Sequence, residues 1–353
     1  MGVAESPISE DEALSSDKID LILSDFGLFL GKKSERLLVR KGGETLQEVP
    51  LFKVQQVIIA SSGVSLSADA VKECADRGIP LYFLSSSGRP YATVLSAGLI
   101  GTIATRREQL LAYADERGLQ LARAFARGKI RNQANFLRYQ GKYRKTRQVD
   151  IYRKLEDASR QILELDRAVE NADGGDLDAI RPVLLNLEAR AAILYWDGLR
   201  TTLAEGVHFE TREKHGADDL VNSCLNYGYG VLYTQIESAL VLAGLDPYAG
   251  FLHTDRSGRP SMVMDLIEEF RQPVVDRTIF GLLNLRTKLE VHDGRLTDES
   301  RHTVATKVLE RLDGLERYEG KKHRLRTIIQ RQARAIASFV RRERRYEPFL
   351  ASW

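Results

Sequence analysis

The chain has 353 residues, of which 43% are hydrophobic and 29% are charged, with a formal net charge of only +3. This apolar content allows one large or two medium cores, and no apolar run approaches the ~18 residues of a membrane span. The two cysteines, Cys74 and Cys224, are too few and too far apart for a disulfide framework or a zinc knuckle, so we expect a reducing, cytoplasmic location.

The first part of the chain is predicted to be β-rich. Residues 1–18 are acidic and serine-rich, lack a signal-peptide pattern, and are expected to be a disordered tail. Residues 19–95 contain a hairpin pattern with a turn at 32–35, an apolar run at 54–60, and a strand–turn–strand pattern at 79–95. One helix interrupts them, with Ser67 as N-cap and Gly78 as its end. We therefore predict a small sheet with one helix.

The rest of the chain is predicted to be helical. Residues 96–101 are the candidate linker, residues 102–345 have helical periodicity, and residues 346–353 are expected to be a tail. The fold class is thus α+β, with a small N-terminal β-rich domain followed by a larger all-α catalytic domain. Helices are expected at 103–114, 116–140, 150–170, 176–204, 217–244, 261–286, 299–313 and 321–345.

Basic side chains concentrate in two segments. Residues 123–147 carry nine Lys or Arg and no acid, and residues 321–345 carry ten against a single acid, Glu343. Amide and aromatic side chains are interleaved with the first run, a combination that suits a phosphate backbone and unstacked bases. Either run alone could be a solvated helix face. Two runs in a chain that also carries metal-type residues favour nucleic acid.

A histidine and two acids lie close together in the segment 251–277. His253 falls in a loop rich in Gly, Ser and Arg, and the helix predicted after it carries Asp265 and Glu268 on one face among apolar residues. Carboxylates in an apolar helix require a partner, and a divalent metal is a suitable one. The alternatives are a hydrogen-bonded structural histidine and two acids that cap the first turn of their helix.

A third carboxylate, Glu188, lies among small residues of a predicted helix and shares a stripe with Ala192 and Tyr195. Small neighbours leave room for a group to approach it, although pairing with Arg190 or Arg181 is the simpler alternative. One histidine and two or three carboxylates would make an oxygen and nitrogen site that suits Mg²⁺ or Mn²⁺ rather than zinc.

Other chemistries are not supported by motifs. The sequence contains neither a G-x-S-x-G nor a P-loop, and NYGYG at 226–230 lacks the strand–turn–helix context of a dinucleotide fingerprint. We interpret NYGYG as part of a helix with close helix–helix packing at Gly228 and Gly230. Its Asn222, Asn226 and Tyr229 could still line a site.

Four blocks occur in an order that resembles a known family. They are LLNLEARAAILYW (184–196), NSCLNYGYGVLYTQIESAL (222–240), AGLDPYAGFLH (243–253) and SMVMDLIEEFRQPVVDR (261–277). Together with the β-then-α layout and the basic C-terminal segment, they closely resemble the CRISPR-associated protein one family, the integrase subunit of CRISPR spacer acquisition.

The resemblance implies a metal-dependent DNA endonuclease and integrase that uses Mg²⁺ or Mn²⁺. The family's metal ligands fall on Glu188, His253 and Glu268, and Asp265 matches a further acid beside the metal. The family's proline-rich, arginine-rich loop is replaced here by HFETREKHGADDL without proline, so no loop function is carried over.

The same resemblance and the basic residues suggest DNA contacts. Arg256, Arg259 and Arg271 flank the predicted site and could hold phosphates, or could instead pair with Glu269 or Asp276. The residues of the C-terminal basic segment that we expect to contact DNA are Lys321, Lys322, Arg324 and Arg326.

The resemblance also implies partners. These are double-stranded DNA (the spacer precursor and the CRISPR repeat), the second, smaller CRISPR adaptation protein, and a second copy of the chain, with no membrane. The homodimer would form through the N-terminal domain, unless that sheet merely packs on its own helical domain. A structure-specific nuclease of repair or recombination and a catalytically silent DNA-binding scaffold are the competing hypotheses.

Overall fold

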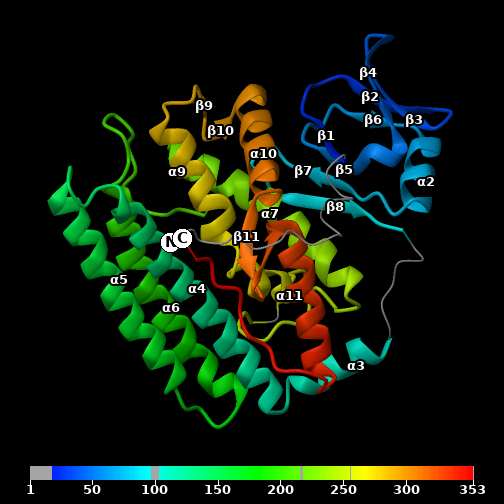
Figure 1. Cartoon of the computed structure of the whole chain (residues 1–353). Coiled ribbons are helices and arrows are strands. Elements are labelled where there is room, and N and C mark those ends of the chain that lie inside the picture. The colour runs from blue at the N-terminus through cyan, green and yellow to red at the C-terminus, as the bar shows by residue number, and fades with distance from the viewer. Residues whose placement is uncertain (1–17, 97–102, 215–217, 255, 353) are drawn as a thin grey trace.

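A computed structural model of the chain describes residues 18–96, 103–214, 218–254 and 256–352. Nearly all of the predicted tail (1–18) and linker (96–101) lies outside these ranges. A strand-rich part is followed by a helical part, which confirms the predicted α+β class (Figure 1).

The strand-rich part holds two four-stranded sheets rather than the single small sheet that we predicted. One sheet has the order β1-β5-β7-β8 and the other has the order β4-β3-β2-β6. The bounds are β1 Ile19–Leu23, β2 Leu28–Lys33, β3 Arg36–Lys41, β4 Glu44–Pro50, β5 Val54–Ile59, β6 Ser65–Leu66, β7 Leu81–Leu84 and β8 Pro90–Val94, with a short 3₁₀ turn at Leu51–Lys53 and helix α2 at Ala68–Asp76. The predicted caps of α2 are confirmed, since Ser67 accepts from the backbone N–H of Ala70 and Gly78 has a φ of 69°.

The apolar run of β5 shows why the sheets pack as they do. Successive side chains of a strand point to opposite faces, so Val57 and Ile59 enter the core shared with the other sheet, while Ile58 enters the core of the helical part. Tyr82 of β7 also lies in the helical core. Both faces of this sheet are therefore covered within one chain, which confirms the alternative that the sheet packs on its own helical domain.

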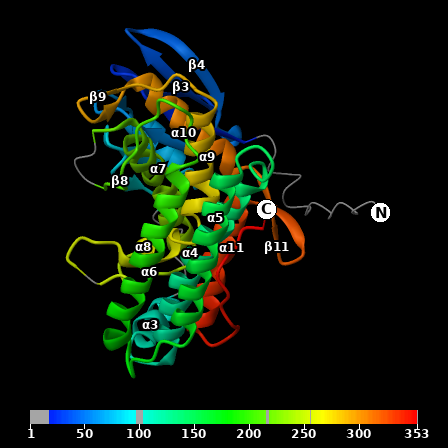
Figure 2. The same ribbon diagram turned by 90° about the vertical axis from the view of Figure 1, so that its left-hand side faces the viewer.

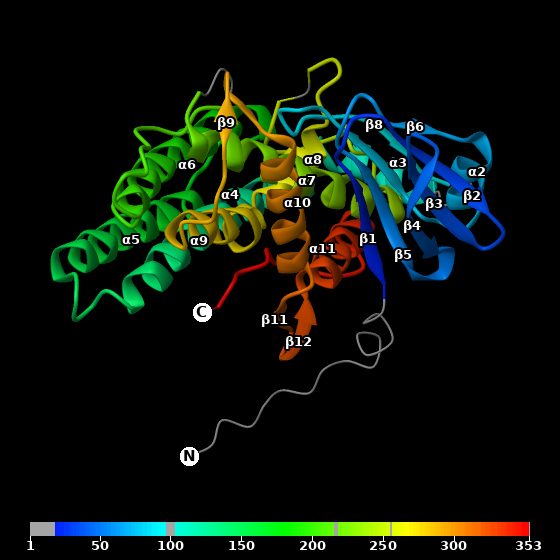
Figure 3. The same cartoon turned by 90° about the horizontal axis from the view of Figure 1, so that it is seen from above.

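The helical part surrounds a long central helix, α7. Its elements are α3 Ile103–Ala112, α4 Glu116–Lys142, α5 Val149–Glu170, α6 Leu177–Arg200, α7 Leu220–Leu242, α8 Ser261–Ile267, a π-helical turn Arg271–Asp276 (η2), α9 Arg277–Asn284, α10 Asp298–Leu312 and α11 Leu325–Val340. The helices α4, α5 and α6 lie side by side, away from the sheets (Figures 1 and 3). Over the described ranges, no helix combines the length and apolar character needed to cross a bilayer.

Two of the predicted helices are wrong in detail. The stretch 261–286 is divided by η2 into separate pieces, and the helix predicted at 321–345 starts only at Leu325. Before it, strands β11 (Leu315–Tyr318) and β12 (Lys321–Arg324) form a hairpin, and β9 (Val291–His292) and β10 (Arg295–Leu296) form another. The hairpins add a little strand structure to the domain that we predicted to be all-α.

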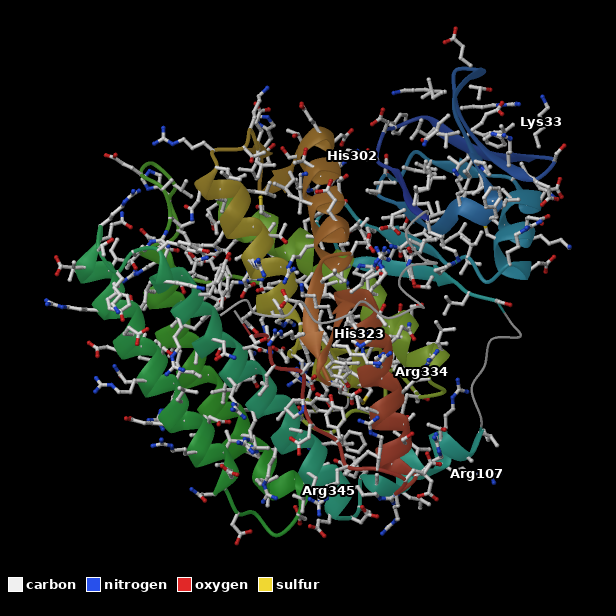
Figure 4. All side chains as sticks on the ribbon, viewed as in Figure 1. Lys33, Arg107, His302, His323, Arg334 and Arg345 are labelled. Atoms are coloured by element: carbon white, nitrogen blue, oxygen red, sulfur yellow. The ribbon has the colours of Figure 1, made fainter. Side chains whose placement is uncertain are left out.

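Close backbone contact joins the two parts at α7. A Cβ on Gly230 would lie 1.6 Å from the carbonyl oxygen of Gly88, in the turn between β7 and β8. The predicted close packing at Gly230 is therefore against a turn of the sheet, whereas Gly228 packs on Val275 and Val308 of neighbouring helical elements, as predicted. A second contact between the two parts involves His302 of α10, which is labelled in Figure 4. Its Nδ1 lies 3.4 Å from the hydroxyl of Ser24.

The C-terminal segment is not a free tail. It runs back along α4 (red in Figure 1), where the side chain of Asn132 donates to the carbonyl of Phe349 and accepts from the N–H of Ala351. The ring of Phe349 stacks on Phe270, with 5.2 Å between centroids. Residues 346–351 therefore belong to the wall behind α8 and η2.

Candidate functional site

A cavity of about 750 Å³ lies where α4, α6, α7, η2 and the loop after α7 meet. The three predicted metal ligands, Glu188, His253 and Glu268, line it. They come from α6, from the loop before α8 and from the end of α8, so the fold joins blocks that are far apart in the sequence.

The ammonium of Lys129 lies between the two carboxylates. It contacts Oε1 of Glu188 directly, and it lies 2.8 Å from Oε2 of Glu268. Burial would lower the pKa of Lys129, but the charges of Glu188 and Glu268 outweigh burial and raise it. The partner of Glu188 is thus neither Arg190 nor Arg181. Arg181 instead pairs with Asp178.

Lys129 can reach this position because α4 passes close to α8. Gly128 makes the approach possible, since a Cβ there would lie 2.9 Å from Cγ of Glu269. In the sequence Lys129 counted only as one of the nine basic residues of the first run, and the approach of α4 to α8 could not be read from that run.

Asp265 builds the loop that presents the histidine. Its buried carboxylate accepts hydrogen bonds from the backbone N–H groups of Phe251, Leu252 and His253, at 2.6, 3.0 and 2.9 Å. The same carboxylate lies 2.8 Å from Nδ1 of His253. Neither Asp265 nor Glu268 caps the helix start, because the first turn of α8 contains no acidic residue. The Nδ1 contact leaves Nε2 as the ring nitrogen available to a ligand.

Arg271 connects the site to a buried tyrosine pair. Its Nε lies 3.1 Å from Oε1 of Glu268, and its guanidinium stacks over the ring of Tyr229 at 4.6 Å. Burial would raise the pKa of Glu268, but Arg271 and Lys129 outweigh burial and hold it well below its usual range. The salt-bridge partner of Arg271 is therefore Glu268 rather than Glu269 or Asp276.

Glu269 has a different role. The hydroxyl of Tyr346 and the N–H of Phe349 both donate to its carboxylate, and burial raises its pKa to about 8. Glu269, which follows Glu268 directly in the sequence, therefore binds the C-terminal segment next to the site.

Basic residues outnumber acidic ones on the cavity wall. Arg256 and Arg259 lie on it, as do Arg212 and Lys214, which the sequence analysis missed. Asn222 and Asn226 accept hydrogen bonds from Arg212 and so fix the loop 210–214 against α7. The segment HFETREKHGADDL therefore supplies part of the wall despite its lack of proline.

The first half of the first basic run is structural. Arg127 pairs with Asp166 of α5, and Asn132, Gln133 and Phe136 are buried between helices. The open basic, aromatic face is therefore limited to the end of the run, where Arg138, Lys142, Tyr143, Lys145 and Arg147 are exposed. Contact of this part with nucleic acid stays a prediction.

The C-terminal basic residues lie away from the cavity. The β11–β12 hairpin, which carries Lys321 and Lys322, and the loop with Arg256 project from opposite sides of the molecule (Figures 2 and 3). Arg326 is paired with Asp313 and Asp20, and its side chain is only 10% exposed, so the structure contradicts a DNA contact there. Arg324 lies 3.6 Å from Asp313.

The donor set fits a divalent ion in chemistry, although the side chains are not gathered around one point. Across the described ranges, no three His, Cys, Asp or Glu side chains are close enough to hold a metal together. The predicted convergence of Glu188, His253 and Glu268 within ligand distance is therefore not seen. The two carboxylates nevertheless already hold one cation, the ammonium of Lys129. Carboxylate oxygens and an imidazole nitrogen are suitable ligands for Mg²⁺ or Mn²⁺.

A buried acid behind the site gives a pH-dependent prediction. Tyr195 and Tyr229 donate to Asp276, and burial raises its pKa from 3.8 to about 6. A raised pKa favours the protonated folded form, so this contribution to stability is full below pH 3.8 and is lost as the pH rises through 6. Relative to Asp276→Asn, the wild type should lose about 3 kcal/mol of unfolding free energy between pH 3 and 8. Urea unfolding of both proteins across this range measures the difference, and a constant difference would contradict a raised pKa.

Comparison with known proteins gives consistent matches over most of the chain. The family described as "CRISPR associated protein Cas1" matches residues 21–310. "CRISPR-associated endonuclease Cas1 1" of Archaeoglobus fulgidus is 37% identical over 345 residues, which cover 94% of this chain and 99% of that protein.

Solved structures with similar folds are more distant in sequence. "Casposase bound to integration product" is 20% identical with a TM-score of 0.76, and the match covers 93% of this chain and 92% of that one. A chain of a "Cas6-RT-Cas1--Cas2 complex" is 19% identical with a TM-score of 0.74. That match covers 99% of this chain but only 37% of that longer one. At such identities the likeness shows the fold alone.

Proposed function

Since this chain belongs to the Cas1 family of CRISPR-associated proteins, we propose that it is a metal-dependent DNA endonuclease and integrase that inserts DNA fragments into a CRISPR array. The observation that carries the proposal is the pair of buried carboxylates, Glu188 and Glu268, that share one cation in a basic cavity beside His253. A catalytically silent scaffold would have no need for such a pair.

Glu188, His253 and Glu268 would hold Mg²⁺ or Mn²⁺, which neutralises charge on the reacting phosphate and activates an attacking hydroxyl. Asp265 holds the imidazole by Nδ1 and so leaves Nε2 as the atom that would bind the ion. Arg256 and Arg259 bind neighbouring phosphates from the cavity wall.

Integration leaves the number of phosphodiester bonds unchanged. The 3′-hydroxyl oxygen of the incoming DNA end attacks a phosphorus of the target strand and loses its proton. A new P–O bond forms as the old P–O3′ bond breaks, and the leaving 3′-oxygen takes up a proton. Water in place of the 3′-hydroxyl gives a nick, so one site performs both endonuclease and integrase chemistry.

The function is tested with a short duplex carrying 3′-hydroxyl ends and a supercoiled plasmid carrying a CRISPR repeat, with Mn²⁺ or with EDTA. Metal-dependent joining of the duplex at the repeat is the expected result. Cleavage without joining and without preference for the repeat would favour the structure-specific nuclease instead.

DNA binding should depend steeply on salt. Each neutralised phosphate contributes about −0.9 to the slope of log K against log salt. Replacing Arg256 and Arg259 by alanine should make the slope shallower by about 1.8 if each contacts one phosphate. The measurement is fluorescence anisotropy of a labelled duplex over a salt series, and an unchanged slope would remove this loop from the DNA interface. Lys321→Ala with Lys322→Ala tests the opposite side of the molecule in the same way.

The chain is also proposed to form a homodimer through its strand-rich part. Strand β4 is a sheet edge, and Leu46 and the neighbouring Phe52 are 57% and 69% exposed. An exposed edge with apolar side chains is a surface that proteins usually cover. The helical part covers one face of the other sheet, β1-β5-β7-β8, and leaves this edge exposed.

Leu46→Asp combined with Phe52→Asp should convert the dimer into monomers in light scattering, because charged side chains at this edge oppose burial. Leu285→Asp is the matched control, since Leu285 is 81% exposed on the helical part. A double variant that dimerises like the wild type would place the contact elsewhere.

The smaller adaptation protein Cas2 is a proposed partner, supported by the complex in which a chain of similar fold occurs. We assign the protein to the cytoplasm, since Cys74 and Cys224 are free thiols, as is usual in a reducing compartment.

A further inference from the structure

The formal charges of the cluster around Lys129 balance without a metal. Two carboxylates, Glu188 and Glu268, face two cations, Lys129 and Arg271. The side chains of Glu188 and Glu268 are only 6% and 2% exposed, so solvent screens these charges little. A divalent ion added to this neutral cluster would leave two buried positive charges uncompensated, which is unfavourable.

The position of the ammonium is the second observation. An ion held by both carboxylates must lie between them, and Nζ of Lys129 already lies there, in contact with an oxygen of each. Lys129 is also a flexible side chain at the edge of the cavity, 15% exposed, so it can leave without unfolding its helix. Arg271 is held differently, by Glu268 on one side and by stacking on Tyr229 on the other.

We propose that Lys129 is a positioning residue that holds the two metal-binding carboxylates together in the metal-free enzyme and is exchanged for the divalent ion when it binds. The inference rests on the proposed metal-dependent function. Without Lys129, only Arg271 would remain beside the two carboxylates, and a proton or a metal would relieve the repulsion between them. With Lys129, the site is preformed and folded before the ion arrives, but the ion must compete with the ammonium.

The first test measures metal affinity by titration calorimetry with Mn²⁺. Lys129→Met removes the competing charge at similar side-chain size, and it should tighten Mn²⁺ binding by about tenfold or more, or about 1.4 kcal/mol. The same variant should melt at a lower temperature than the wild type in EDTA and recover in Mn²⁺. The control is Lys288→Met, since Lys288 is a solvent-exposed lysine that pairs with Glu290 and does not line the cavity. It should leave the affinity for Mn²⁺ within about twofold, because charges exposed to solvent and distant from a site are screened by salt.

The second test uses the wild-type protein, so it does not depend on the folding of a variant. Lysine acetylation is followed by mass spectrometry with EDTA and with Mn²⁺. Lys129 should be protected in EDTA by its two ion pairs and should become several-fold more reactive in Mn²⁺, with the exposed Lys288 unchanged.

Each outcome has a separate meaning. If the wild type does not bind Mn²⁺ at all, the proposed function fails. If it binds Mn²⁺ but Lys129→Met binds it equally or more weakly, or if Lys129 stays protected in Mn²⁺, the exchange is overturned while the metal site remains. Should Lys129→Met not fold in EDTA, Lys129→Gln, which keeps a hydrogen-bond donor, replaces it in the titration.

Discussion

Replacing Glu188 by glutamine is expected to lower strand transfer by about 10³-fold, with little loss of DNA binding. The amide keeps the shape of the side chain and can still accept a hydrogen bond from Lys129, but it removes the charge that a divalent ion requires. Charge stabilisation by a bound metal is worth several kcal/mol, and each step of about 1.4 kcal/mol is tenfold in rate. Binding persists because it depends on the basic wall, with Arg256 and Arg259, rather than on the carboxylate pair.

The measurement combines the strand-transfer assay with anisotropy on the same DNA. Glu164→Gln is the matched control, because Glu164 lies on the exposed face of α5 and should retain wild-type activity. Strand transfer at the wild-type rate by the Glu188 variant would remove this residue from the site. A parallel loss of DNA binding would mean that the carboxylate positions the DNA rather than the ion.

Replacing Asp265 by alanine is expected to cost about 3–5 kcal/mol of unfolding free energy. The substitution leaves the backbone N–H groups of Phe251, Leu252 and His253 buried without their acceptor. Each stranded buried donor costs about 1–3 kcal/mol, although the loop will relax and recover part of this. Mn²⁺ affinity should also fall, by about 10- to 100-fold, because the histidine loses the group that orients it.

Chemical unfolding in EDTA isolates the first effect, and titration with Mn²⁺ isolates the second. Asp246→Ala is the control on the same connection between α7 and α8. The carboxylate of Asp246 accepts one backbone hydrogen bond, from Tyr248 at 2.8 Å, so its loss should cost about 1 kcal/mol. An Asp265 variant as stable as this control would show that the loop is held by other contacts.

The fold class followed from periodicity because periodicity is a local property. Alternating apolar residues marked the strands of the first hairpin, and Ser67 and Gly78 marked the ends of α2, since capping depends on residues within one turn. The pairing of strands into two sheets could not be read in the same way, because the run at 54–60 is apolar on both faces and does not say what covers each. The hairpin at 315–324 was missed for a related reason, since its basic residues suit either a helix or an edge strand.

The same distinction between local and tertiary properties applies to the site. The sequence by itself determined which residue types could bind a metal, since Glu188, His253, Asp265 and Glu268 stand out as polar groups in apolar surroundings. Only the tertiary structure decided what each one does. In the folded chain, Asp265 binds the loop that contains His253, and Glu268 pairs with Arg271. Arg326 forms an ion pair away from the cavity. Lys129, one of nine basic residues in its run, lies at the centre of the site. The physical reason is that burial and charge pairing depend on the approach of helices distant in sequence, and these interactions determine whether a charge binds a ligand, a neighbour or solvent.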